Sequence, residues 1–227
     1  MGKRIKEKNV LTLTKNRETF LSYVKKFYSR EQDFPNSSSY FHKRVIEMIK
    51  TSENYNDLLN EKIFLEFVYA TLSTWGLDRM DGTARLVKFD VLRKSILDKS
   101  SLLADLAGYK IESLNEVEKQ DIEKKLLILF DELRIMIREA KLVGVSKALH
   151  HLLPDLVMPI DRRYTLNFFY GATDYNGGNQ KEKFLEIFNE FHVISKKLNL
   201  ESKDLTGQWD TSIPKLIDNA IIGFISV

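Results

Sequence analysis

Apolar residues recur at intervals of three and four positions wherever a period can be counted in this 227-residue chain. That spacing places them on one face of an α-helix, whereas a half-buried strand alternates apolar and polar residues. The one short alternating stretch, residues 10–13, is interpreted as extended N-terminal chain. The sequence therefore predicts an all-α, multi-helix globular protein.

Two segments show the helical period most clearly. Residues 116–140 are predicted to form one long amphipathic helix, and a second helix is predicted to carry the apolar stripe from Phe184 to Leu198, after a loop at residues 176–179. A closing helix is predicted over residues 211–224, where Pro214 is tolerated in the first turn. Shorter helices are predicted at residues 17–28, 38–49, 60–75 and 83–97.

Composition narrows the class of protein. Hydrophobic residues make up 43% of the chain, which is enough to build a folded core. The absence of cysteine excludes disulfides, thiolate metal sites and cysteine nucleophiles. There is no run of about 18 apolar residues and no apolar stretch of the kind that a secretory signal requires. We therefore expect a cytoplasmic protein without membrane contact.

Charge is distributed unevenly, although the formal net charge is only +3. Residues 1–30 hold nine lysine or arginine residues against two glutamates, whereas residues 112–139 hold eight carboxylates against five basic residues. The basic end could present a surface to the phosphates of nucleic acid. It could equally be a solvated basic N-terminal arm.

Residues 142–165, LVGVSKALHHLLPDLVMPIDRRYT, contain the one stretch that suggests chemistry. A turn around Gly144 that opens a helix would leave backbone N–H groups of Gly144, Val145 and Ser146 free to bind a phosphate. The alternative is an ordinary turn between helices, with Ser146 capping the second one. Lys147 follows at once, and Pro154 is expected to end the short helix near Leu153.

This order of a glycine turn, a lysine and a Pro-Ile-Asp step resembles the core of the helix-hairpin-helix DNA glycosylase superfamily. The family hairpin reads Leu-Pro-Gly-Val-Gly, so that Val143 stands at the proline and Ser146 near the second glycine. The resemblance implies one all-helical unit over residues 1–227 with two possible lobes and a cleft between them. One lobe would comprise residues 35–165 and the other both chain ends, 1–34 and 166–227.

In that family a lysine after the hairpin attacks the sugar C1′ atom and forms a Schiff base, and an aspartate stabilises the charge that develops there. The resemblance thus implies that Lys147 and Asp161 are catalytic residues. The residues themselves leave alternatives open. Lys147 could be an exposed surface lysine, and Asp161 could act only as the cap of the helix that follows it.

Neighbouring residues suggest how nucleic acid would be held. Arg162 and Arg163 follow Asp161 and diverge by about 100° on a helix, so that one could contact a DNA phosphate while the other pairs with a carboxylate. Trp75 could stack on an exposed base, although the segment around it, with Asp78 and Asp81, also fits a capped turn. The adjacent pair His150 and His151 cannot share one metal ion, and buried, hydrogen-bonded histidines are expected instead.

Two functions follow from these observations. The first is a DNA-binding base-excision glycosylase and lyase for DNA repair, which acts through Lys147 and Asp161 without a metal or cofactor. The second is a non-catalytic nucleic-acid-binding or protein-interaction helical module. No Walker loop, nucleophile elbow or dinucleotide-binding glycine motif is present, so the sequence offers nothing for those enzyme classes.

Overall fold

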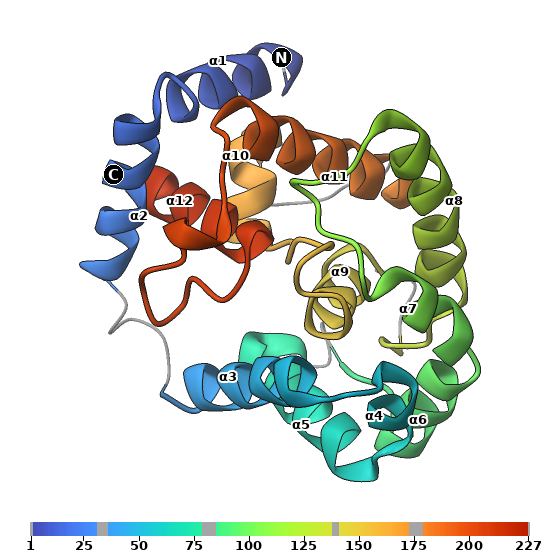
Figure 1. The fold of residues 1–227 in the computed structure, drawn as a ribbon. Coiled ribbons are helices and arrows are strands. Elements are labelled where there is room, and N and C mark those ends of the chain that lie inside the picture. The colour runs from blue at the N-terminus through green and yellow to red at the C-terminus, as the bar shows by residue number, and fades with distance from the viewer. Residues whose placement is uncertain (1, 31–35, 79–84, 138–140, 173–178, 227) are drawn as a thin grey trace.

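The protein is described from a computed structural model that covers residues 2–30, 36–78, 85–137, 141–172 and 179–226 (Figure 1). These residues are mostly helical, and the only β-structure among them is an isolated antiparallel bridge between Leu86 and Met136. The predicted all-α class is confirmed. None of the described helices is both long enough and apolar enough to span a membrane.

The helical elements vary from single turns to five-turn helices. In chain order they are α1 (Gly2–Leu13), α2 (Arg17–Tyr28), α3 (Asn36–Thr51), α4 (Tyr55–Asn60), α5 (Lys62–Leu72), a π-helical turn η2 (Ser73–Leu77), α6 (Phe89–Leu97), α7 (Ser100–Leu106), α8 (Glu116–Glu132), α9 (Lys141–Leu152), a second π-helical turn η3 (Arg162–Leu166), α10 (Asn167–Tyr170), α11 (Gln180–Lys197), a 3₁₀ turn η4 (Ser202–Asp204) and α12 (Ile213–Ile225).

The helices predicted near residues 17–28, 38–49, 184–198 and 211–224 are confirmed as α2, α3, α11 and α12. Side-chain caps account for several of their starts. Asn16 accepts a hydrogen bond from the backbone N–H of Thr19, and Ser212 caps α12 just before Pro214. Of the predicted loop at 176–179, residues 176–178 lie outside the described residues.

The N-terminal prediction was wrong. Residues 10–13 belong to α1 rather than to extended chain, and the basic segment forms α1 and α2 instead of a solvated arm. The Lys6 ammonium holds α1 against α11, because it pairs with Glu186 and Glu190 of that helix at 2.9 and 2.8 Å. Lys6 is one of the basic residues that could have contacted the phosphates of nucleic acid, and in the structure it is engaged in these ion pairs instead.

Two predicted helix boundaries were also wrong, for one shared reason. The helix predicted over 116–140 ends at Glu132, and the one predicted over 83–97 begins only at Phe89. Between them, the N–H of Val87 donates to the carbonyl of Ile135, and the N–H of Ile137 donates to that of Arg85. Extended pairing across the chain therefore replaces helix here. Residues 83, 84 and 138–140 lie outside the described residues.

Both sequence ends of the described chain pack against each other. α12 lies along α2 and also contacts α1, α10 and α11 (Figure 1). Gly223 makes the α2–α12 approach possible, because a Cβ atom there would collide with the Tyr23 carbonyl oxygen. This close crossing brings Phe27 of α2 beside Ile222 of α12, and both residues line the candidate site.

Helix α9 lies in the middle of the fold and contacts α3, α5, α8 and α11 (Figure 1). All its residues from Gly144 to Leu152 are buried. Gly144 has no side chain because the thioether of Met136 occupies the place that a Cβ atom would take. The residues that α9 carries are thus fixed by packing on several sides, which is a suitable foundation for a site.

Candidate functional site

The predicted phosphate-binding turn at Gly144, Val145 and Ser146 does not exist. These residues lie inside α9, which begins at Lys141, and all three are buried. At these positions of a helix the backbone N–H groups point along the helix axis towards the carbonyl groups four residues earlier, and not towards a phosphate. Gly144 indicated a turn in the sequence, but in the structure it leaves room for the Met136 side chain to pack against α9. We retain none of the three as DNA-binding residues.

Ser146 has a positioning role instead. Its hydroxyl donates to the Val143 carbonyl and accepts the N–H of Ile160, both at 3.1 Å. The second bond crosses from α9 to the Pro159-Ile160-Asp161 segment. Ser146 therefore fixes the backbone immediately before Asp161 to the helix that carries Lys147.

Lys147 and Asp161 meet. The Lys147 ammonium donates to Asp161 Oδ2 at 3.2 Å and to the backbone carbonyl of Trp75 at 3.1 Å. Lys147 is buried, so the alternative of an exposed surface lysine is wrong. Asp161 also caps η3, because its Oδ1 accepts the N–H of Arg163 at 2.8 Å. One carboxylate thus serves as a helix cap and as the partner of Lys147.

The surroundings of Asp161 keep its carboxyl group ionised. Burial by itself would raise its pKa, but the Lys147 ammonium and the backbone N–H groups of Arg163 and Tyr164 outweigh burial and lower the pKa below its ordinary value. About a third of the Asp161 side chain is exposed. The site therefore presents a fixed negative charge that solvent can reach.

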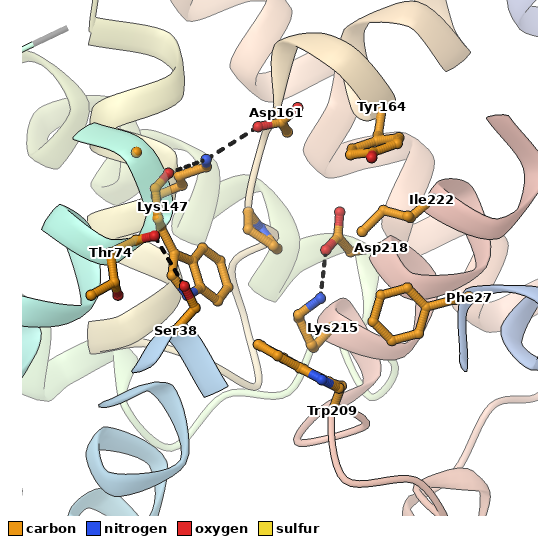
Figure 2. A pocket seen from close by; sticks show the side chains of 13 residues that line it. Phe27, Ser38, Thr74, Lys147, Asp161, Tyr164, Trp209, Lys215, Asp218 and Ile222 are labelled. Atoms are coloured by element: carbon orange, nitrogen blue, oxygen red, sulfur yellow. Dashed lines mark hydrogen bonds and ion pairs between the residues drawn. The ribbon is translucent and has the colours of Figure 1, made fainter. Parts of the chain in front are cut away.

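Lys147 and Asp161 line a pocket of about 260 Å³ (Figure 2). Its other walls come from α2, α3, η2, the segment before α12 and α12 itself, so that both sequence ends contribute to it. Most of the wall is aromatic or aliphatic. The apolar and aromatic lining residues are Phe27, Trp75, Pro159, Tyr164, Trp209 and Ile222.

Trp75, the candidate for base stacking, lies in the pocket wall. It belongs to η2, in which the next residue, Gly76, has a left-handed conformation (φ 80°) that glycine adopts readily. The Lys147 ammonium lies 5.9 Å from the centroid of the Trp75 ring. Asp81, the second carboxylate of the predicted capped turn, lies outside the described residues.

A second lysine–aspartate pair lines the same pocket, and sequence reasoning missed it. The Lys215 ammonium donates to Asp218 Oδ2 at 2.8 Å and to Asn219 Oδ1 at 2.5 Å, and all three residues are buried. Asn219 in turn donates to Asp210 Oδ1 and to the carbonyl of Trp209. The network attaches the Trp209 loop to α12. Burial raises the pKa of Asp218, although Lys215 opposes the shift.

A signal for this pair was present in the sequence. Helix α12 is apolar on nearly every side, which is typical of a fully buried helix. Lys215, Asp218 and Asn219 share one face of that helix at i, i+3 and i+4. Charged residues inside a buried helix must pair with one another, so this spacing predicts a buried polar cluster.

Three histidines join the elements behind the pocket. His151 Nδ1–H donates to the Lys147 carbonyl, which leaves His151 Nε2 to accept from His42 Nδ1–H at 3.1 Å. His42 Nε2 then accepts the hydroxyl proton of Thr211 at 2.9 Å. The expectation of buried, hydrogen-bonded histidines is confirmed, with His150 Nδ1–H donating to Val157. His42, His150 and His151 are all neutral, as their lowered pKa values require.

Burial keeps the histidines neutral. It lowers the pKa of His42 and His150 well below the ordinary value and lowers that of His151 to about 4. In the part of the chain that the structure describes, no group of three or more histidines and carboxylates is placed to bind a metal ion.

Arg162 and Arg163 are exposed on η3, one and two residues after Asp161. The Arg163 guanidinium lies 5.3 Å from the Tyr164 ring centroid, and Tyr164 lines the pocket. Both arginines are therefore available at the edge of the site.

No protein-family model, no curated protein and no solved structure matches this chain. The interpretation of the site therefore depends on its own geometry.

Proposed function

We propose that this protein is a base-excision DNA glycosylase with lyase activity, in which Lys147 is the nucleophile and Asp161 the charge-stabilising carboxylate. One observation carries the proposal. Lys147 and Asp161, 14 residues apart in the sequence, meet at 3.2 Å in the wall of an aromatic pocket. An enzyme that acts on a base must take it out of the stack into such a pocket.

The pocket suits one nucleobase. Its volume of about 260 Å³ lies just below the range of about 300–1,000 Å³ that is usual for drug-sized ligands. The faces of Trp75, Trp209 and Phe27 offer stacking surfaces, which are worth about 1–3 kcal/mol per base in single-strand binding proteins. Arg162 and Arg163 would contact the phosphates on either side of the extruded nucleotide.

The chemistry requires proton and electron transfers that the residues can support. Lys147 must first lose a proton, and the Asp161 carboxylate is the acceptor in direct contact with its ammonium. Because about a third of the Asp161 side chain is exposed, it can pass that proton to water and is ionised again when positive charge develops at C1′. The amine lone pair then forms the bond to C1′, while the bond from C1′ to the base breaks and leaves its electron pair on the base, which takes up a proton. The attached nitrogen then loses one proton, and its lone pair forms the C=N bond while the C1′–O4′ bond breaks. The O4′ atom takes the electron pair of that bond and a proton, so that the sugar ring opens and the protonated imine is left.

Borohydride trapping tests this proposal, because reduction of the imine leaves a stable covalent adduct. We expect duplexes that contain 8-oxoguanine or an abasic site to form the adduct with the wild-type protein and not with Lys147→Ala. Lys94→Ala is the matched control, since Lys94 is an exposed lysine on α6 that pairs with Asp98. Failure of every damaged duplex to form an adduct would rule out the Schiff-base mechanism.

A second candidate is a nucleic-acid-binding or protein-interaction module without chemistry. It is favoured by the two hydrogen bonds of the Lys147 ammonium, to Asp161 and to the Trp75 carbonyl, which suit a structural ion pair as well. Salt-dependent binding to undamaged DNA, without adduct or strand cleavage, would support this candidate. The absence of DNA binding even at low salt would favour a protein partner.

A further inference from the structure

The Lys215–Asp218 pair has no part in the chemistry assigned to Lys147, yet it faces the same pocket. Both side chains are almost fully buried, with 4% and 6% of their surfaces exposed. A buried ion pair is costly to desolvate and seldom contributes net stability, so its place in a pocket wall requires a reason. That reason can be found in the pattern of donors and acceptors that the pair presents.

The pair offers a row of one donor and two acceptors. In the described part of the chain, two of the three ammonium protons of Lys215 go to Asp218 and Asn219, which leaves the third for an occupant of the pocket. The Oδ2 atom of Asp218 accepts a hydrogen bond from Lys215 and retains a further lone pair. The other carboxylate oxygen of Asp218 points away from Lys215 (Figure 2). Read from Lys215 outward, the order is donor, acceptor, acceptor.

This order is also that of the pairing edge of cytosine, which presents an amino group, a ring nitrogen and a carbonyl. Its complement is guanine, whose edge presents a carbonyl O6, an N1–H and a 2-amino group. Thymine and uracil place a carbonyl opposite the second carboxylate oxygen, where the two acceptors repel. Adenine presents a donor, an acceptor and a C–H, so that its amino group faces the Lys215 ammonium and its N1 atom faces the first carboxylate oxygen, and both contacts are mismatched.

The aromatic walls would hold a stacked base within reach of the donor and acceptors of Lys215 and Asp218. The Lys215 ammonium lies 5.8 and 5.7 Å from the ring centroids of Trp75 and Trp209. Trp75 is also the ring beside the Lys147 ammonium. A base that stacks on Trp75 would thus lie near both the Lys147 and the Lys215 ammonium groups.

We infer that Lys215 and Asp218 are specificity-determining residues that select a guanine-type base by imitating the pairing edge of cytosine. The inference rests on the proposed function for the statement that the occupant is a base in DNA. Guanine lesions altered only at C8 or N7 retain this edge, so they fall within the predicted substrate class. Uracil, thymine and alkylated adenine fall outside it.

Intrinsic fluorescence gives a direct test, since the chain has two tryptophans and both line the pocket. We expect deoxyguanosine to quench this fluorescence with at least roughly tenfold higher affinity than deoxyinosine, which lacks only the 2-amino group, because a site built around a hydrogen bond rejects the analogue without it. Thymidine and deoxyadenosine should bind more weakly than deoxyguanosine as well. This panel uses the wild-type protein and needs no variant to fold.

The Asp218→Asn variant sharpens the test, because its amide replaces one acceptor with a donor. We expect it to lose the preference for deoxyguanosine over deoxyinosine, while Asp98→Asn, at an exposed aspartate that directly follows α6, retains it. Circular dichroism would establish that both variants are folded. If Asp218→Asn does not fold, the wild-type panel alone decides.

The outcomes separate this inference from the proposed function. Equal affinity for deoxyguanosine and deoxyinosine, or no quenching up to millimolar nucleoside, overturns the inference even where borohydride traps an adduct. A clear guanine preference without an adduct on any duplex supports the inference and overturns the proposed chemistry.

Discussion

Two lysine–aspartate pairs face one pocket and differ in their surroundings. Asp161 is about a third exposed and accepts backbone N–H bonds at the start of η3, whereas Asp218 is buried in the middle of α12. The pKa of Asp161 is lowered and that of Asp218 is raised. Each has one lysine partner that lowers its pKa, so the opposite directions follow from the fuller burial of Asp218 and from the backbone N–H bonds that Asp161 accepts.

The difference teaches which pair is suited to which task. An ionised, solvent-accessible carboxylate can stabilise positive charge that develops on a substrate. A buried pair with a fixed geometry is better suited to discriminating between ligands, because a ligand with the wrong donors and acceptors leaves the buried polar groups without hydrogen-bond partners. The experiments below test this division, beginning with the largest expected effect.

Removal of the buried carboxylate should cost the most stability. We expect Asp218→Ala to lower the free energy of unfolding by about 3–5 kcal/mol, because Lys215 is left as an unpaired buried charge. Asp161→Ala should cost only about 1–2 kcal/mol, the value of a lost helix cap. Urea unfolding followed by circular dichroism measures both. Equal losses would remove the distinction between the two pairs.

Acid should break the histidine chain that connects the elements carrying the two pairs. The folded-state pKa of His151, about 4, lies below its ordinary value of 6.5, so the native state binds fewer protons than the unfolded state between these values. The stabilising contribution is complete above pH 6.5 and is lost as the pH falls towards 4. At about 1.4 kcal/mol per pKa unit, the loss is roughly 3 kcal/mol.

The His151→Asn variant measures this contribution, because asparagine retains a donor for the Lys147 carbonyl and does not titrate. Its stability should decline less than that of the wild type over the same pH window. Both Lys147 and Lys215 lower the pKa of His151. Nuclear magnetic resonance titration of Lys147→Met should therefore find a raised His151 pKa, and an unchanged value would contradict the geometry.

Ser146 provides a way to disturb one pair and not the other. Ser146→Ala leaves the buried N–H of Ile160 without its acceptor, and we expect a loss of about 1–3 kcal/mol in unfolding free energy. Ser195→Ala is the matched control, since this buried hydroxyl donates only to the His192 carbonyl of its own helix. Ser146→Ala should weaken adduct formation and leave nucleoside binding intact. Loss of both functions would mean that the pairs are coupled.

The smallest expected effect is that the contributions of Asp161 and Asp218 to the free energy of unfolding change with pH in opposite directions. Because the pKa of Asp161 is lowered, its contribution is present above its ordinary value of 3.8 and is lost as the pH falls through the folded-state pKa. Because the pKa of Asp218 is raised, its contribution declines as the pH rises through 3.8 towards the folded-state value. Asp161→Asn and Asp218→Asn should therefore diverge from the wild type with opposite slopes in acid urea titrations.

Helical periodicity was sufficient to predict the class and several helices, because burial of one face is a local property of the sequence. It failed where a partner distant in sequence decided the backbone. Arg85 and Val87 pair with the segment at 135–137, so they do not start a helix. Gly144 looked like a turn, but only the position of Met136 explains why glycine stands there.

The site was predicted in part. Lys147 and Asp161 were singled out from local order, and the structure brings them into contact. Lys215 and Asp218 were missed, because the apolar residues that predict the closing helix do not by themselves show that its charged residues are buried as well. The arrangement of Trp209 could not be predicted, since it follows from the Asn219 bonds that hold its loop.

The crossing of α2 and α12 has a consequence for how the molecule is made. Synthesis produces α2 first, and its buried face of Phe20, Val24 and Phe27 has no α12 to pack against until nearly two hundred further residues have emerged. Contacts so distant in sequence close late and slow the folding of a chain. The nascent protein must therefore keep an apolar helix face shielded from aggregation, and its pocket forms only at the last docking step.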